Sequence, residues 1–216
     1  MEITYLGQSS FKIKGKDATL VTDPFKPDFV GLKFPKVEAD IVTVSHNHLD
    51  HNFTAGVEGA PFVVDRPGEY EIKGVSIFGY PTFHDAKLGA ERGENTIFLI
   101  EMDGISICHL GDLGCKLPDK ILEEINVADI LLVPVGGEVS LNPTEANEVI
   151  KQTEPLIVIP MHFKLEGMKE DFAKFATVDQ FLKEVGVESP ERLDKLSVTK
   201  DKLPEETKII LLERKG

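Results

Sequence analysis

The residues best suited to chemistry lie in one short run, His46-Asn47-His48-Leu49-Asp50-His51, which holds three histidines and an aspartate. The run directly follows residues 41–45 (IVTVS), a largely β-branched stretch typical of a strand buried on both faces. Neutral imidazole and carboxylate are the donors that suit Zn²⁺ and its neighbours among the transition metals. An ordinary hydrophobic core does not need so many of these groups together, so the run predicts a metal site.

The strands and helices that position this run are predicted from the apolar patterns along the chain. Strands are expected at residues 3–6, 11–14, 18–22, 41–45, 62–65, 69–72, 75–83, 96–102 and 105–109. Helices at residues 118–125, 143–152 and 178–185 then alternate with strands at residues 130–135, 156–160 and 208–213. A helix can also begin within residues 52–57, and the charged residues 163–177 are expected to form a surface excursion. This order predicts sheets packed on each other with helices outside.

Composition narrows the class of protein. The 216 residues suit one domain, and 41% apolar with 28% charged residues is typical of a globular chain. No apolar stretch is long enough to cross a membrane. The net charge of −13 disfavours nucleic acid as a partner. Residues 1–5 read as a strand rather than a secretory signal, and Cys108 and Cys115 read as free thiols, so we expect a cytoplasmic protein.

The run matches the H-x-H-x-D-H motif of the metallo-β-lactamase superfamily, which the chain resembles over nearly its whole length. Residues 5–11 (YLGQSSF), the Asp23-Pro24 pair and residues 134–137 (PVGG) resemble the branch of ascorbate-6-phosphate lactonase and uncharacterised Zn-dependent hydrolases. The resemblance implies an α/β fold, a four-layer αββα sandwich of two mixed sheets with helices on the outside. It also implies a single domain, residues 1–216, with pseudo-halves at about 1–103 and 104–216. Gln8 departs from the pattern, because many relatives have a histidine there.

The resemblance also implies the remaining metal ligands, which are a later histidine, an aspartate after a strand and a final histidine. His84, Asp112 and His162 occur in that order, each near the end of a strand-like stretch. The implied ligands of a first metal ion are His46, His48 and His84. Those of a second ion are Asp50, His51 and His162, with Asp112 bridging the two ions. Two divalent ions are therefore expected, Zn²⁺ first, with Mn²⁺ or Fe²⁺ as alternatives.

Several other residues could support this centre. His109 lies three residues before Asp112, so strand alternation predicts that it faces away in a structural or supporting role. Asp23 and Asp65 could orient metal-binding histidines, or could be turn residues. Cys115 is interpreted as a buried or edge thiol rather than a ligand.

Candidate substrate contacts are weaker predictions. Three aromatic side chains could wall a pocket or belong to the core, namely Phe29, Phe34 and Phe53. Three basic side chains could bind an anionic group or be surface charge, namely Lys87, Arg92 and Lys164. Residues 85–95 could be a substrate loop or a solvated connection.

The predicted activity is metal-dependent hydrolysis by a metal-bridged hydroxide. Asp50 is the predicted catalytic residue, as a metal ligand that also accepts a proton from the attacking water. The expected substrate is a small molecule, an ester, lactone or phosphodiester with or without a phosphate group. His48 favours hydrolysis, since related diiron enzymes have a carboxylate at that position.

Two alternatives stay open. One is a non-catalytic metal-dependent binding or sensing protein on the same fold. Gln8 is compatible with this alternative, because an amide side chain cannot gain or lose a proton as a histidine would. The other is a hydrolase of the phosphodiesterase or nuclease type. A homo-oligomer is compatible with the sequence as well.

Overall fold

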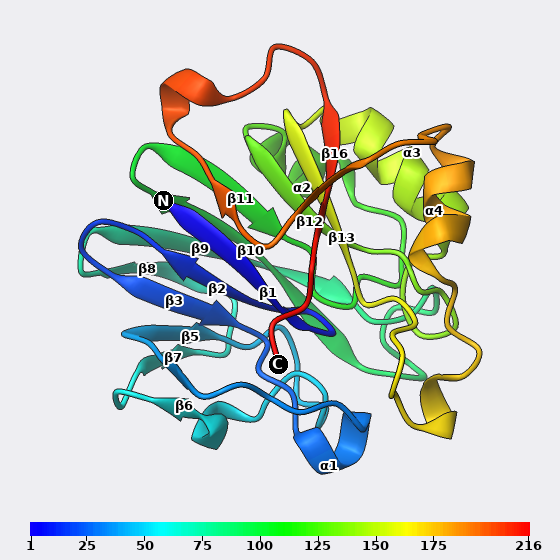
Figure 1. Ribbon diagram of the computed structural model, residues 1–216, viewed down its shortest axis with the longest axis horizontal. Coiled ribbons are helices and arrows are strands. Elements are labelled where there is room, and N and C mark those ends of the chain that lie inside the picture. The colour runs from blue at the N-terminus through cyan, green and yellow to red at the C-terminus, as the bar shows by residue number, and fades with distance from the viewer.

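The computed structural model describes residues 1–216 as two β-sheets packed face to face (Figure 1). The first sheet contains β1 (Glu2–Gly7), β2 (Ser10–Lys14), β3 (Thr19–Thr22), β5 (Ile41–Thr43), β7 (Phe62–Val64) and β15 (Leu196–Ser197). The second contains β8 (Gly68–Ile72), β9 (Val75–Phe83), β10 (Glu94–Met102), β11 (Ile105–His109), β12 (Ile130–Pro134), β13 (Ile157–Met161), β14 (Glu191–Leu193) and β16 (Lys208–Leu212). Their orders are β15-β1-β2-β3-β5-β7 and β14-β16-β13-β12-β11-β10-β9-β8. The predicted sandwich of two mixed sheets is confirmed.

Helices cover the two sheets unequally. The second sheet carries α2 (Asp119–Ile125), α3 (Pro143–Thr153) and α4 (Val178–Glu184), which lie together beside its parallel strands (Figure 1). The first sheet is covered by the short α1 (Pro27–Val30) and by a ladder of β4 (Val37–Glu38) with β6 (Val57–Glu58). Three 3₁₀ turns complete the fold, η1 (Thr54–Gly56), η2 (Glu170–Phe172) and η3 (Lys200–Lys202).

The alternation of side chains along β3 and β5 produces two cores. Leu20 and Ile41 face the second sheet and join a cluster of 42 buried residues between the sheets. Their neighbours Val21 and Val42 face the opposite way and join a cluster of 13 buried residues under α1 and β4. Both faces of these strands are therefore buried, which explains why their sequences read as continuous apolar runs.

Strand direction brings many strand ends to one edge. β3 and β5 are parallel in the first sheet, and β11, β12 and β13 are parallel in the second. β9 runs in the same direction as β11, because both are antiparallel to β10. The carboxyl ends of these strands therefore meet at one edge of the sandwich, which is where open α/β sheets place their ligands.

Three local predictions were wrong. β5 ends at Thr43, two residues before the predicted end of this strand, and the histidine run follows in bends. Residues 52–57 hold only the short turn η1 at Thr54–Gly56, because Val57 and Glu58 pair with β4 instead of continuing a helix. Residues 163–177 do not lie entirely on the surface, since Phe172 and Phe175 are buried in the core under α1.

The predicted division into pseudo-halves near residue 103 falls in the turn between β10 and β11 and stays a prediction. No helix in the structure combines the length and the apolar character that crossing a bilayer requires.

Candidate metal centre

The seven predicted ligands come together at this edge of the sandwich. His46 follows β5, His84 follows β9 directly, Asp112 follows β11, and His162 follows β13 directly. One group of donor atoms within 4.8 Å of one another contains His46, His48 and His84. A second such group contains Asp50, His51, Asp112 and His162.

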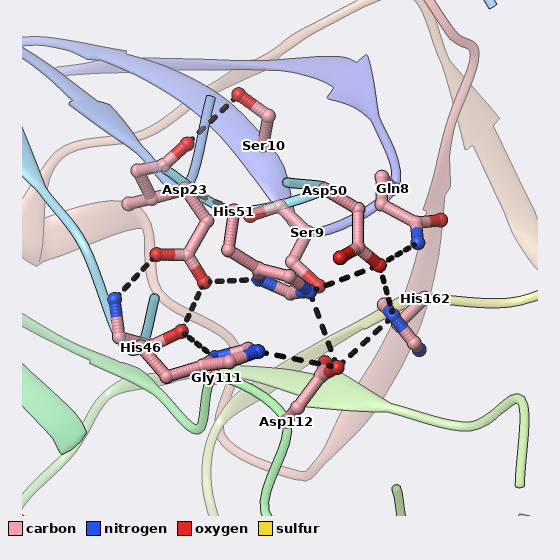
Figure 2. A network of polar contacts seen from close by, with 12 residues as sticks. Gln8, Ser9, Ser10, Asp23, His46, Asp50, His51, Gly111, Asp112 and His162 are labelled. Carbon is pink, nitrogen blue, oxygen red and sulfur yellow. Dashed lines mark hydrogen bonds and ion pairs between the residues drawn. The ribbon is translucent and has the colours of Figure 1, made fainter. Parts of the chain in front are cut away.

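Asp112 lies between the two groups. Its Oδ2 atom is 3.1 Å from Nε2 of His51 and 3.2 Å from Nε2 of His162. The same oxygen is 3.4 Å from Nε2 of His84 and 4.0 Å from Nε2 of His46, which belong to the other group. Figure 2 shows the His51 ring surrounded by three carboxylates. Asp112 Oδ2 therefore lies within 4.0 Å of histidine nitrogens from both groups.

The chemistry of these donors fits divalent cations. Nε2 of His46, His51 and His162 and Oδ1 of Asp112 are buried and have no hydrogen-bond partner. Unpaired buried polar atoms are costly and rare in folded proteins. Cations bound at the two groups would satisfy all four, because each atom offers a lone pair when the imidazoles are neutral. His48 is the least buried of the ligand candidates.

Charges in the centre oppose the effects of burial. Burial by itself would raise the pKa of the Asp112 carboxyl, but the imidazoles of His162 and His51 hold that pKa below its ordinary value. Burial would lower the pKa of His51, whereas the carboxylates of Asp112 and Asp50 raise it well above the usual value. Burial and the charge of His51 lower the pKa of His46 to about 2. Without cations, therefore, the carboxylates favour a second proton on the His51 ring, whereas the His46 ring stays neutral.

Asp23 orients one histidine of each group. It follows β3, is fully buried, and accepts hydrogen bonds from the Ser45 N–H at 2.7 Å and the Ser45 hydroxyl at 2.6 Å. Its Oδ2 atom also accepts from Nδ1 of His51 at 2.8 Å. The Ser45 hydroxyl uses its hydrogen for the bond to Asp23. Its oxygen therefore accepts a hydrogen bond from Nδ1–H of His46 at 2.9 Å. Both rings therefore carry their proton on Nδ1 and keep Nε2 free for a metal.

Gln8 forms a hydrogen bond with Asp50, a carboxylate of the second donor group. Its Nε2 atom donates to Oδ2 of Asp50 at 3.0 Å, and its main-chain oxygen accepts from the His162 N–H at 2.9 Å. Gln8 and His162 both have left-handed backbones, with φ of 55° and 52°. Such conformations cost free energy outside glycine and persist where the surrounding structure enforces them. Gln8 thus links two ligand candidates that are far apart in the sequence.

Asn95 is a supporting residue that the sequence reasoning missed. Its Oδ1 atom accepts from the Asp112 N–H at 2.9 Å, and its amide donates to the Leu110 oxygen at 3.0 Å. Gly111 lets this contact form, since a Cβ atom there would lie 2.3 Å from Oδ1 of Asn95. A lone asparagine at the start of a strand has no local pattern that marks it.

His109 has the structural role predicted for it. Its Nδ1 atom accepts from the Gly111 N–H at 3.1 Å, so its Nε2–H donates to the Ser9 oxygen at 2.8 Å. Burial lowers the pKa of His109, which keeps the ring neutral. Asp65 was a wrong candidate for orienting a histidine, because it is exposed and its carboxylate lies beside Arg66 at 3.8 Å.

A cavity of about 450 Å³ opens over the centre. It is lined by Phe29, Asn47, His48, Leu49, Asp50, His84, Arg92, Asp112, Val139, Asp171, Phe172 and Phe175. Phe29 and Arg92 were predicted contacts, whereas the contribution of Asp171, Phe172 and Phe175 was missed. Cys115 lines a different cavity, beside α3.

The other candidate contacts lie elsewhere. Phe34 packs edge-on against Phe53 in the core under α1, with ring centroids 6.4 Å apart. Lys87 pairs with Glu91 at 2.6 Å. The Lys164 ammonium donates to a main-chain oxygen at residue 173. Of residues 85–95, only Arg92 lines the cavity.

Comparison with known proteins decides the family. Residues 2–162 match the model of the beta-lactamase superfamily domain. A solved Thermotoga maritima structure, assigned as a Zn-dependent hydrolase of the metallo-beta-lactamase superfamily, is 40% identical, covers 99% of both chains and has a TM-score of 0.82. The chain belongs to the metallo-β-lactamase superfamily.

Two further relatives extend the comparison. A protein of Pelotomaculum thermopropionicum named UPF0173 metal-dependent hydrolase is 31% identical over 206 residues, covering 81% of this chain and 90% of the relative. Igni18, a metallo hydrolase of Ignicoccus hospitalis, shares the fold with a TM-score of 0.68 and 19% identity, over 100% of this chain and 95% of that one.

Proposed function

We propose that this protein is a metal-dependent hydrolase with two divalent ions, Zn²⁺ first among them. One ion would be held by His46, His48 and His84, the other by Asp50, His51 and His162, with Asp112 shared. The observation that carries the proposal is the set of buried, unpaired ring nitrogens directed at the Asp112 carboxylate. The hydrolase names of the relatives support the same reading.

The bound ions would lower the pKa of a water and polarise the bond to be cleaved. Asp50 lines the cavity, and Gln8 fixes one of its oxygens. The Asp50 carboxylate is the proposed acceptor of a proton from the attacking water. Asp23 and Ser45 keep the rings of His51 and His46 in the orientation that leaves Nε2 free.

The substrate is proposed to be a small ester, lactone or phosphodiester, which a cavity of about 450 Å³ can hold. The net charge of −13 argues against nucleic acid. The two cysteines are unpaired, which favours a cytoplasmic location for this activity.

A metal-dependent sensor is the second candidate. It is favoured by Gln8, whose amide contacts Asp50 and cannot exchange a proton with it. Two ions with turnover would support the hydrolase, and one bound ion without turnover would support the sensor.

The test joins metal analysis to a substrate panel. The protein is stripped with a chelator and reloaded with Zn²⁺, Mn²⁺ or Fe²⁺, and the ions are counted before assays with esters, lactones and phosphodiesters. Asp112→Ala should lose metal and activity together, because both ions would depend on this carboxylate. Full activity with both ions retained in that variant would refute the assignment, and a fully loaded but inert protein would refute hydrolysis.

A further inference from the structure

The cavity over the metal centre has a continuous aromatic wall. The Phe29 ring lies edge-on to Phe172 with centroids 6.0 Å apart, and Phe172 lies edge-on to Phe175 at 5.3 Å. The Phe175 ring is in turn 4.9 Å from the ring of His162. These contacts form an unbroken path from the surface to a residue of the centre.

The mouth of the same cavity exposes apolar surface. Phe29 is 37% exposed and Leu49, one residue after His48, is 46% exposed. Val139 lines the cavity as well. Large apolar side chains that are exposed together beside a site usually contact a ligand. An apolar group of the ligand would gain burial against both sides of the mouth.

Apart from the proposed ions, the walls of the cavity do not suit a phosphate. No lysine lines the cavity and Arg92 is its one arginine, whose guanidinium already reaches the main-chain oxygen of Glu138 at 3.5 Å. Asp171 places a carboxylate in the lining next to the aromatic wall. Phosphate sites are commonly built from clustered cations or several N–H groups, and Asp171 would repel such an anion.

We infer that the substrate is an uncharged ester or lactone that carries an aromatic or branched alkyl group, and that it bears no phosphate. This inference rests on the proposed hydrolase function and selects among its substrates. Water adds its oxygen to the carbonyl carbon and the bond from that carbon to the ester oxygen breaks. One proton remains with the resulting acid group and one passes to the alcohol, so no oxidant or reductant is needed. The apolar group lies along the aromatic wall during this step.

The kinetic test compares ethyl phenylacetate, ethyl acetate and diethyl phosphate on the metal-loaded protein, with the released acid titrated at constant pH. We expect kcat/KM for the phenylacetate to exceed that for the acetate by about tenfold or more. Phe29→Ala and Leu49→Ala should each reduce this ratio several-fold. Phe62→Ala is the matched control, because Phe62 is 54% exposed on β7 and lies outside the cavity. It should leave the ratio unchanged.

A binding measurement separates the inference from the activity. Calorimetry on the metal-loaded protein compares phenylacetate, acetate and inorganic phosphate, of which the first two carry the same carboxylate. Phenylacetate should bind about tenfold more tightly than acetate, and Phe29→Ala should remove the difference.

Equal binding of the two carboxylates, tighter binding of phosphate, or a preference for the phosphodiester would overturn the apolar specificity. Tight binding of phenylacetate without turnover of any ester would instead overturn hydrolysis and leave the specificity standing.

Discussion

Replacing Asp23 with asparagine should weaken both proposed metal sites at once. The carboxylate can only accept hydrogen bonds, and it receives them from Nδ1 of His51 and from the Ser45 hydroxyl. An amide NH₂ in place of Oδ2 would donate to both groups instead. His51 would then need its proton on Nε2, and the Ser45 hydroxyl would turn to donate to Nδ1 of His46. Both rings would present an N–H to the metal centre in place of a lone pair.

The size of the effect follows from the two contacts. Removing a partner that orients a metal-bound histidine costs about 10- to 100-fold in metal affinity. Asp23 serves one histidine in each donor group, directly for His51 and through Ser45 for His46. Each ion should therefore lose about 10- to 100-fold in affinity, which corresponds to about 1.4–2.8 kcal/mol.

The assay is a competition titration with a chromophoric chelator, with circular dichroism to establish that the variant folds. Asp65→Asn provides a matched control, since Asp65 is exposed and contacts Arg66 rather than a histidine. That variant should bind both ions as the parent does. If folded Asp23→Asn also bound both ions with unchanged affinity, the proposed orientation of the two rings would be wrong.

Four further outcomes are expected. Gln8→Ala should lower turnover more than metal content, because it removes the hydrogen-bond donor to Asp50 and leaves the ligand set complete. Turnover equal to that of the parent protein would show that this hydrogen bond does not contribute to the reaction. Metal binding should release a proton from His51, because the surrounding carboxylates raise the pKa of this ring; metal affinity should therefore fall as the pH is lowered through neutrality. Calorimetry in buffers of different ionisation enthalpy measures the proton release. Metal binding without proton release would contradict this prediction. His109→Ala should lose about 1–3 kcal/mol of stability to denaturant yet keep its metal stoichiometry, and metal loss by the folded variant would contradict its structural role. Cys108 should react with a thiol reagent at pH 8 only after denaturation, because burial raises the pKa of its thiol; rapid labelling of the native protein would speak against its burial.

The strands and the metal motif were readable from the sequence because their signals are local. The predicted bounds of β9 and β11 match the structure residue for residue, since each is an apolar stretch between turn residues. The spacing within residues 46–51 is a property of one short segment. The positions of His84 and His162 at strand ends also follow from local pattern, although the resemblance was needed to connect them.

What surrounds the ligands was decided by tertiary structure. Gln8, Asp23 and Asn95 reach the centre from segments separated by tens of residues, and no periodicity or spacing records such contacts. The sequence offered Asp23 and Asp65 on equal terms, and only the packing of β3 beside β5 placed Asp23 against the histidine run. Residues 163–177 carry enough charge to read as surface, yet Phe172 and Phe175 turn inward and wall the cavity. The sequence by itself thus determined which donors could bind metal, because residue type and local spacing are properties of the sequence. The folded structure determined how those donors are oriented and which side chains line the cavity, because both depend on contacts between distant segments.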